Sequence, residues 1–223
     1  LAAGVCAMPA IIPASAWGAD GVAAPSERIT LGAIGMGGRG RDDLQVFMAQ
    51  PDVQVLAVCD VNGENREKVK TMVNQKYGNE DCAAYIDFRD LLARDDIDAV
   101  LIATGDNNHS LVSVMAARAG KDMYCEKPMS VTIGDSRAVA DTMKRLGRIF
   151  QCGTQRRSVG NFVYACELAR SGKLGKLKEL HAEQAGGMFE FNYEILPEEP
   201  EPARGVFDWS GWLGGAQWQI GRA

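Results

Sequence analysis

Residues 29–40 read Ile-Thr-Leu-Gly-Ala-Ile-Gly-Met-Gly-Gly-Arg-Gly. The apolar run over 29–34 predicts a buried strand, and residues 42–50 predict a helix that ends near Pro51. Between them, residues 35–40 have the G-x-G-x-x-G spacing of a turn that binds the phosphates of a dinucleotide. The candidate cofactor-binding residues of this turn are Gly35, Met36, Gly37, Gly38, Arg39 and Gly40.

Each glycine of the G-x-G-x-x-G pattern is predicted to have its own role. Gly35 permits a tight turn after the strand, Gly37 lets the backbone approach a pyrophosphate, and Gly40 lets the helix pack close to the strand. The start of the helix then offers unpaired N–H groups and the positive end of its dipole to the phosphates.

Asp60 stands twenty residues beyond Gly40, after a β-branched apolar run over 53–59 that predicts a second buried strand. A carboxylate at this place accepts hydrogen bonds from ribose hydroxyls and repels a 2′-phosphate. The sequence therefore favours NAD over NADP as the cofactor. Arg66 could oppose this preference, but its place in a polar helical stretch predicts a solvated position on the helix surface.

Apolar strand-like runs alternate with helical stretches as far as residue 155. Strands are predicted over 98–103, 123–125 and 149–152, and helices over 64–76, 88–93, 109–119 and 133–146. Strands that are apolar throughout are typical of a parallel sheet covered by helices on both faces. We therefore predict an α/β fold with a doubly wound parallel sheet (Rossmann) over residues 29–155.

Residues 156–223 are predicted to begin a second α/β domain with an open-faced sheet. A helix is predicted over 159–171, and alternating apolar and polar residues predict a half-exposed strand over 177–184. Because the chain stops soon after Asp208 and Trp209, this second domain is expected to be incomplete.

Residues 1–28 are predicted to be a leader or signal segment and arm. Residues 1–19 carry no charge, two prolines interrupt them, and residues 14–16 are the small Ala-Ser-Ala of a cleavage site. The interpretation we favour is export to the bacterial periplasm in the folded state. The alternatives are a membrane-spanning helix, which the prolines disfavour, an arm on a neighbouring subunit, and a cytoplasmic protein if the leader is not a signal.

The composition excludes several classes of partner. The net charge is −5, the pI is about 5.2 and the basic residues are scattered, so nucleic acid is not an expected partner. The six cysteines contain no C-x-x-C pair and only two histidines are present, which argues against a zinc site. We predict no metal and no integral membrane span.

A Glu126-Lys127-Pro128 segment follows the strand predicted at 123–125. Ligands bind beyond the carboxyl ends of the strands in open α/β sheets, so Lys127 is a candidate for chemistry on a bound substrate. The alternative is a surface ion pair between the side chains of Glu126 and Lys127.

Four segments, taken in order, resemble one known family. They are the glycine turn, Ala-Thr-Gly-Asp-Asn-Asn-His at 103–109, Glu-Lys-Pro at 126–128 and Gly-Thr-Gln at 153–155. This set is similar to the glucose–fructose oxidoreductase, inositol dehydrogenase and rhizopine-catabolism family (Gfo/Idh/MocA). The likeness extends to its exported bacterial members, which have an aspartate–tryptophan segment like residues 208–212.

The resemblance implies a nucleotide domain followed by a substrate domain, whose open sheet often forms an oligomer interface, and hence a homo-oligomer. It implies that Lys127 lies beside the nicotinamide and the reacting carbon, and that His109 and its turn line the cofactor pocket. The alternative for His109 is a cap on the helix that follows. The cofactor-binding residues implied in these segments are Thr104, Asp106, Asn108, His109, Glu126, Lys127 and Gln155.

The implied function is hydride transfer between NAD and a hydroxyl carbon of a sugar, cyclitol or related polyol, with Lys127 as the catalytic residue. Two alternatives stay open. One is an NAD-dependent glycosidase of the same family, whose members tend to depart from Glu-Lys-Pro, and the other is a nucleotide-binding module without catalysis. Family dehydrogenases commonly add an Asp-x-x-x-His pair from the second domain, and this sequence has no such pair.

Overall fold

A computed structural model of the protein describes residues 23–181 and 201–215. The chain divides into two compact units, and the first contains the described residues up to Gly153 together with those from Ala203. The second contains the described residues between them. Most of the predicted leader, residues 1–22, lies outside the described residues.

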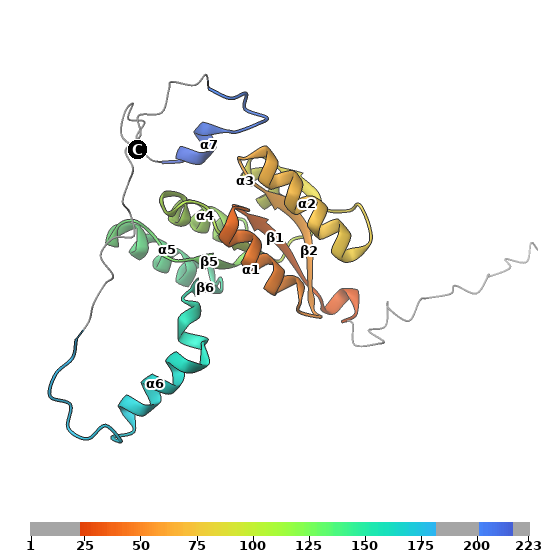
Figure 1. Ribbon diagram of the computed structural model, residues 1–223. Helices are drawn as coiled ribbons and strands as arrows, with labels where there is room; N and C mark the ends of the chain where they lie inside the picture. The colour runs from red at the N-terminus through yellow and green to blue at the C-terminus, as the bar shows by residue number, and fades with distance from the viewer. Residues whose placement is uncertain (1–22, 182–200, 216–223) are drawn as a thin grey trace, which may run out of the picture. The chain divides into compact units, whose positions relative to one another are not determined.

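A six-stranded sheet with every strand parallel forms the centre of the first unit (Figure 1). Its strands are β1 (Ile29–Ile34), β2 (Val53–Cys59), β3 (Ala83–Tyr85), β4 (Ala99–Ile102), β5 (Asp122–Glu126) and β6 (Phe150–Gly153). The strand order is β3-β2-β1-β4-β5-β6. The order reverses between β1 and β4, which is the point where doubly wound sheets open a crevice for ligands.

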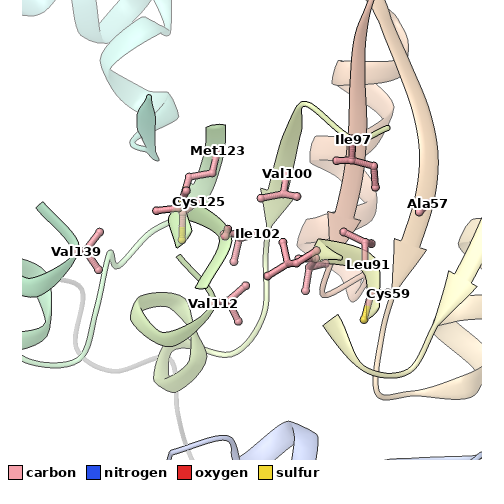
Figure 2. Close-up of a cluster of buried hydrophobic side chains, with 14 of the residues drawn as sticks. Ala57, Cys59, Leu91, Ile97, Val100, Ile102, Val112, Met123, Cys125 and Val139 are labelled. Atoms are coloured by element: carbon pink, nitrogen blue, oxygen red, sulfur yellow. The ribbon is translucent and has the colours of Figure 1, made fainter. Parts of the chain in front are cut away.

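Helices cover this sheet on both faces, and each face has its own apolar core. The helices are α1 (Gly38–Met48), α2 (Gly63–Tyr77), α3 (Phe88–Leu92), α4 (Asp106–Arg118) and α5 (Ile133–Leu146), preceded by a 3-10 turn, η3 (Pro25–Glu27). One core includes Leu91, Val112 and Val139 from α3, α4 and α5 (Figure 2). The other includes Leu44 and Val69 from α1 and α2. The predicted doubly wound parallel sheet is therefore confirmed.

One strand of the sheet is not evident in the sequence. β3 is three residues long and pairs with β2 at the sheet edge. So short a segment cannot display the period of two that marks a strand. Its position nevertheless places the turn that follows it next to the carboxyl end of β2, because parallel neighbours end at the same edge.

The second unit contains η4 (Gln155–Ser158) and α6 (Gly160–Arg170), so the helix predicted over 159–171 is confirmed. The strand predicted over 177–184 is wrong in its described part, because residues 177–181 have no regular secondary structure. Leu177 and Leu180 are both exposed. A strand is held by backbone hydrogen bonds to a neighbouring strand, and the described residues of this unit contain none.

The segment from Ala203 to Gly215 packs on the first unit and contains α7 (Trp209–Leu213). The sequence pattern places these residues with the second domain, whereas in the structure they contact the turns after β2 and β4. No helix within 23–181 and 201–215 has both the length and the apolar character needed to cross a membrane.

Candidate functional site

A cavity of about 600 Å³ lies at the carboxyl ends of β1, β2 and β4. Its walls are the glycine turn after β1, the turn after β2, the turn before α3 and the turn after β4. The segment 203–215 completes them. This is the crevice at the reversal of strand order, where ligands of doubly wound folds bind.

The glycine turn has the geometry that its spacing predicts. Gly35 has φ of 83°, and a Cβ there would lie 2.5 Å from the backbone nitrogen of Thr104. A Cβ on Gly40 would overlap the carbonyl oxygen of Gly35, so α1 can begin this close to β1 only without a side chain. A Cβ on Gly37 would meet nothing within 4 Å, and this residue lines the cavity. Gly37 therefore leaves open space where a ligand could approach the backbone.

Two helix starts on the cavity wall, those of α1 and α4, have no side-chain cap. The N-cap residues of α1 and α4 are Gly37 and Gly105, and neither helix start has a side-chain hydrogen bond. In contrast, Asn62, Asp87 and Thr132 cap α2, α3 and α5 with their side chains. The free N–H groups and dipole ends of α1 and α4 fit a phosphate-bearing ligand.

Asp60 is buried at the end of β2, on the wall of the cavity. Its Oδ2 accepts a hydrogen bond from the backbone N–H of Met36 at 2.5 Å, and its Oδ1 accepts one from Asn62 at 2.7 Å. Burial raises the pKa of this carboxyl, although these hydrogen bonds act in the opposite direction. Met36 itself is fully buried, so Asp60 fixes the glycine turn through the Met36 backbone.

The solvated position predicted for Arg66 is wrong. Only 8% of its surface is exposed, and its guanidinium donates a hydrogen bond of 2.9 Å to the carbonyl oxygen of Asp60. A second nitrogen donates to the carbonyl of Gly205 at 3.3 Å. Arg66 is buried because it satisfies main-chain carbonyls that meet at this corner, a contact that helical polarity does not reveal.

Glu126 connects the glycine turn with the end of β5. Its buried carboxylate lies 3.1 Å from Nε of Arg39, and the same guanidinium contacts Asp43 at 2.5 Å. Lys127 is exposed, and its backbone N–H donates to Glu126 at 3.1 Å. The alternative of a Glu126–Lys127 side-chain ion pair is therefore wrong, because Arg39 holds Glu126. The Lys127 ammonium has no ion pair among the described residues.

Asp43 is a second buried carboxyl beside Glu126. Burial raises the pKa of Asp43 to about 6, and its contact with Glu126 adds to the rise while Arg39 opposes it. Its Oδ2 is buried without a hydrogen-bond partner among the described residues. Two carboxyls and one guanidinium thus meet directly beneath the glycine turn, and protonation of Asp43 relieves the repulsion between the acids.

We expect Asp43→Asn to flatten the dependence of stability on pH. The pKa of Asp43 in the folded protein, about 6, lies above its ordinary value of 3.8, so the folded state binds more protons than the unfolded state between these values. The free energy of unfolding therefore falls as pH rises through about 4 to 6, by on the order of 1–3 kcal/mol. Urea unfolding of both proteins across this range measures the difference. Parallel pH profiles for the two proteins would refute the assignment.

The other predicted site residues occupy different places. Thr104 and Asn108 line the cavity, whereas Asp106 is exposed at the start of α4 and is not part of its wall. His109 is 1% exposed; its Nδ1 lies 2.5 Å from the carbonyl oxygen of Pro128 and its Nε2 lies 3.1 Å from that of Thr104. His109 therefore joins the turns after β4 and β5, and it is not among the residues that line the cavity. Gln155 belongs to the second unit.

Several residues on the cavity wall have no counterpart in the sequence prediction. They are Phe88, Arg89, Leu111, Arg204, Phe207 and Trp212. The segment 208–212 stands out in the sequence as an aspartate–tryptophan motif, but no local pattern connects it to a turn more than a hundred residues earlier. The edge strand β3, which places Phe88 and Arg89, is equally inconspicuous.

Comparisons with known proteins agree with this geometry. The model of an oxidoreductase family with an NAD-binding Rossmann fold, GFO_IDH_MocA, matches residues 29–154. An inositol 2-dehydrogenase of Salmonella typhimurium is 30% identical over 173 residues, which are 77% of this chain and 48% of the relative. A glycosyl hydrolase family 109 protein of Saccharopolyspora erythraea is 33% identical over 153 residues, 66% of this chain and 33% of the relative.

Among solved structures, scyllo-inositol dehydrogenase from Lactobacillus casei with bound NAD(H) and scyllo-inositol is similar at a TM-score of 0.58. It is 25% identical, and the match covers 66% of this chain and 42% of that chain. This chain spans about half the length of the inositol dehydrogenase relative and less of the glycosyl hydrolase relative. The family match covers the whole parallel sheet and the glycine turn, so the chain belongs to the GFO/IDH/MocA oxidoreductase family with an NAD-binding Rossmann fold.

Proposed function

We propose that the protein carrying this chain is an NAD-dependent oxidoreductase that transfers a hydride to or from a hydroxyl carbon of a sugar, cyclitol or related polyol. The observation that carries the proposal is the link from the glycine turn through Arg39 and Glu126 to Lys127. This link connects the backbone of Lys127, an exposed residue, to the glycine turn on the cavity wall. The inositol dehydrogenases among the relatives support the class of substrate.

In this proposal NAD, when bound, supplies the hydride acceptor. The open backbone at Gly37 and the free N–H groups of α1 bind the pyrophosphate, and Asp60 binds a ribose hydroxyl. Lys127 accepts the proton of the substrate hydroxyl as the hydride leaves its carbon. Glu126 keeps the Lys127 backbone in place while its own charge is matched by Arg39.

The test is NADH formation by the full-length protein, followed by absorbance with a panel of cyclitols, sugars and polyols. Net reduction of NAD by one of these supports a dehydrogenase. Cleavage of aryl glycosides without net NADH would favour a glycosidase, the alternative that the glycosyl hydrolase relative represents. Tight NAD binding with neither reaction would favour a module without catalysis.

The finer part of the proposal is a preference for NAD over NADP. Three arginines line the cavity, and each has a carboxylate partner: Arg39 contacts Asp43 and Glu126, Arg89 lies 2.9 Å from Asp87, and Arg204 lies 3.2 Å from Asp208. None of these three arginines therefore adds net positive charge for a 2′-phosphate. Asp60 keeps the wall at the end of β2 negative.

Asp60→Ala is expected to narrow the preference for NAD(H). Loss of the carboxylate removes hydrogen bonds to ribose and its repulsion of a 2′-phosphate, so NAD affinity should fall about 10-fold while NADP affinity falls less. Calorimetry with both nucleotides measures the ratio of affinities. Asp60→Asn serves as the matched control, because it preserves the volume that packs against the Met36 backbone. Tighter binding of NADP(H) by the unaltered protein would overturn the assignment.

Two further proposals rest on the sequence: export to the periplasm, supported by the uncharged leader, and a homo-oligomer formed through the second domain. N-terminal sequencing of protein from fractionated cells tests the first, and an intact Leu1 in the cytosol contradicts it. Sedimentation of the full-length protein tests the second, and a monomer contradicts it.

A further inference from the structure

Residues 203–215, here called the strap, cross the open side of the cavity. The strap is attached first to the turn after β2. The N–H of Gly63 donates to the carbonyl oxygen of Val206 at 2.7 Å, and the N–H of Asp208 donates to that of Val61 at 3.0 Å. These two bonds align the start of the strap with the turn that carries Asp60.

The strap is attached a second time, at the start of α4 on the opposite side of the cavity. The side-chain amide of Asn107 donates to the carbonyl oxygen of Leu213 at 2.9 Å. That of Asn108 donates to the carbonyl oxygen of Trp212 at 2.8 Å. Gly214 packs so closely on Asn108 that a Cβ would overlap its side chain. The strap therefore joins the two turns that flank the cavity, and α7 lies next to α4 (Figure 1).

An aromatic surface on the strap faces the cavity. Phe207, Trp209 and Trp212 form a ring cluster with centroid distances of 4.7 and 5.7 Å. Phe207 and Trp212 belong to the cavity wall, yet Trp212 is 46% exposed. Phe88 and Leu111 line the same cavity from α3 and α4. A large exposed aromatic side chain on a cavity wall is a surface that a planar ligand could bury.

The strap also leaves a buried acceptor without a donor. Because the Nδ2 of Asn108 donates to the strap, its Oδ1 is buried with no hydrogen-bond partner among the described residues. This oxygen lies against Gly214, so the strap closes it off from the cavity. The ligand feature that the wall itself favours is a planar aromatic base, which would cover the exposed face of Trp212.

We propose that the strap is the outer wall of the adenosine site, with the adenine of the dinucleotide against Trp212. This inference rests on the proposed binding of NAD. It assigns the adenosine half to the end of the cavity between the turn that carries Asp60, α3 and the strap. Because the strap is attached on both sides, release of the nucleotide requires its detachment from Asn107 and Asn108.

Trp212→Ala tests the contact with adenine. In the full-length protein, affinity for NADH should fall about 10-fold, and affinity for ADP-ribose should fall by a similar factor, because base–aromatic stacking is lost in both. Trp212→Phe should recover most of the affinity. Tyr164→Ala, which removes an exposed aromatic ring on α6 outside the cavity wall, should change neither. Thermal unfolding checks that each variant is folded.

Asn107→Ala tests the attachment, because Asn107 holds the strap without belonging to the cavity wall. Stopped-flow displacement of NADH should show dissociation several-fold faster than from the unaltered protein. If Trp212→Ala does not fold, the second readout is energy transfer from tryptophan to bound NADH, measured in Trp212→Phe and in the unaltered protein. Equal energy transfer in the two proteins overturns the proposal. NADH and ADP-ribose binding unaffected by Trp212→Ala also overturns it. Failure of the unaltered protein to bind NADH would instead overturn the proposed function on which it rests.

Discussion

Replacing Lys127 by Met is expected to lower turnover of the full-length enzyme by about 10²–10⁴-fold, the usual contribution of a positioned general acid or base. The reason lies in the position of the side chain. Lys127 directly follows β5, is exposed, and has no ion pair among the described residues, so its amine is available to a substrate. Met preserves much of the volume while it removes the group that accepts the proton.

Nucleotide affinity should change little in this variant. The glycine turn and Asp60 form most of the predicted cofactor contacts. The hydrogen bond from Lys127 to Glu126 uses the backbone N–H, which Met retains. Calorimetry with NAD and steady-state rates with an active polyol separate the two effects. Lys144→Met, which removes an exposed lysine from α5 in the same unit, is the matched control. Near-normal turnover of Lys127→Met would exclude Lys127 as the base.

The sheet could be predicted because its signals are local. The apolar strand at 29–34, the glycine turn and Asp60 lie within one short stretch, and their order alone defines the first β-turn-α-β unit. Strands buried on both faces then predict parallel pairing, because only helices on both sides can cover them. The order of the strands in the sheet is not contained in these local signals and comes from the structure.

The contacts that complete the site could not be predicted, because they join residues far apart in sequence. Arg39 and Glu126 are 87 positions apart. Arg39 also pairs with its local partner Asp43, whereas Glu126 does not pair with the side chain of its local partner Lys127. Arg66 resembles a surface residue until Gly205 supplies a carbonyl 139 positions later. Hydrophobic periodicity records which side of an element is buried, and it does not record which polar groups meet in the folded chain.

The strap illustrates the same limit for a whole segment. The Asp208-Trp209 motif is conspicuous in the sequence, but its position in the chain, after residues 156–202, assigns it to the second domain. In the structure it returns to the first unit because backbone groups after β2 and the side-chain amides of Asn107 and Asn108 in α4 bind it. Such pairings depend on the distance between two turns, which exists only after the sheet has formed.

The glycine turn offers a matched pair of substitutions, Gly37→Ala and Gly40→Ala, that separates binding from folding. A Cβ on Gly40 overlaps the carbonyl oxygen of Gly35, so the start of α1 must shift. We expect the free energy of unfolding to fall by about 1–3 kcal/mol, as for other overpacked sites. Gly37 has φ of −63° and open space around its Cβ position, so Gly37→Ala should fold with nearly unchanged stability.

Binding should reverse this order of effects. The Cβ added by Gly37→Ala projects into the space that the pyrophosphate is proposed to enter, and it blocks the approach of the phosphate to the backbone N–H groups. NAD affinity should therefore fall about 100-fold or more. Denaturant unfolding and calorimetry on the same preparations give the two quantities. Gly78→Ala is not a suitable control, because Gly78 has φ of 67° and an alanine there would be strained. Gly38 lies in the first turn of α1 with open space around its Cβ position. Gly38→Ala therefore tests whether any methyl group at this helix start has the same effect. A Gly37→Ala protein that binds NAD as tightly as the unaltered chain would mean that the phosphates do not approach the turn at Gly37. The anion would then have to bind at the uncapped start of α4, which also lies on the cavity wall.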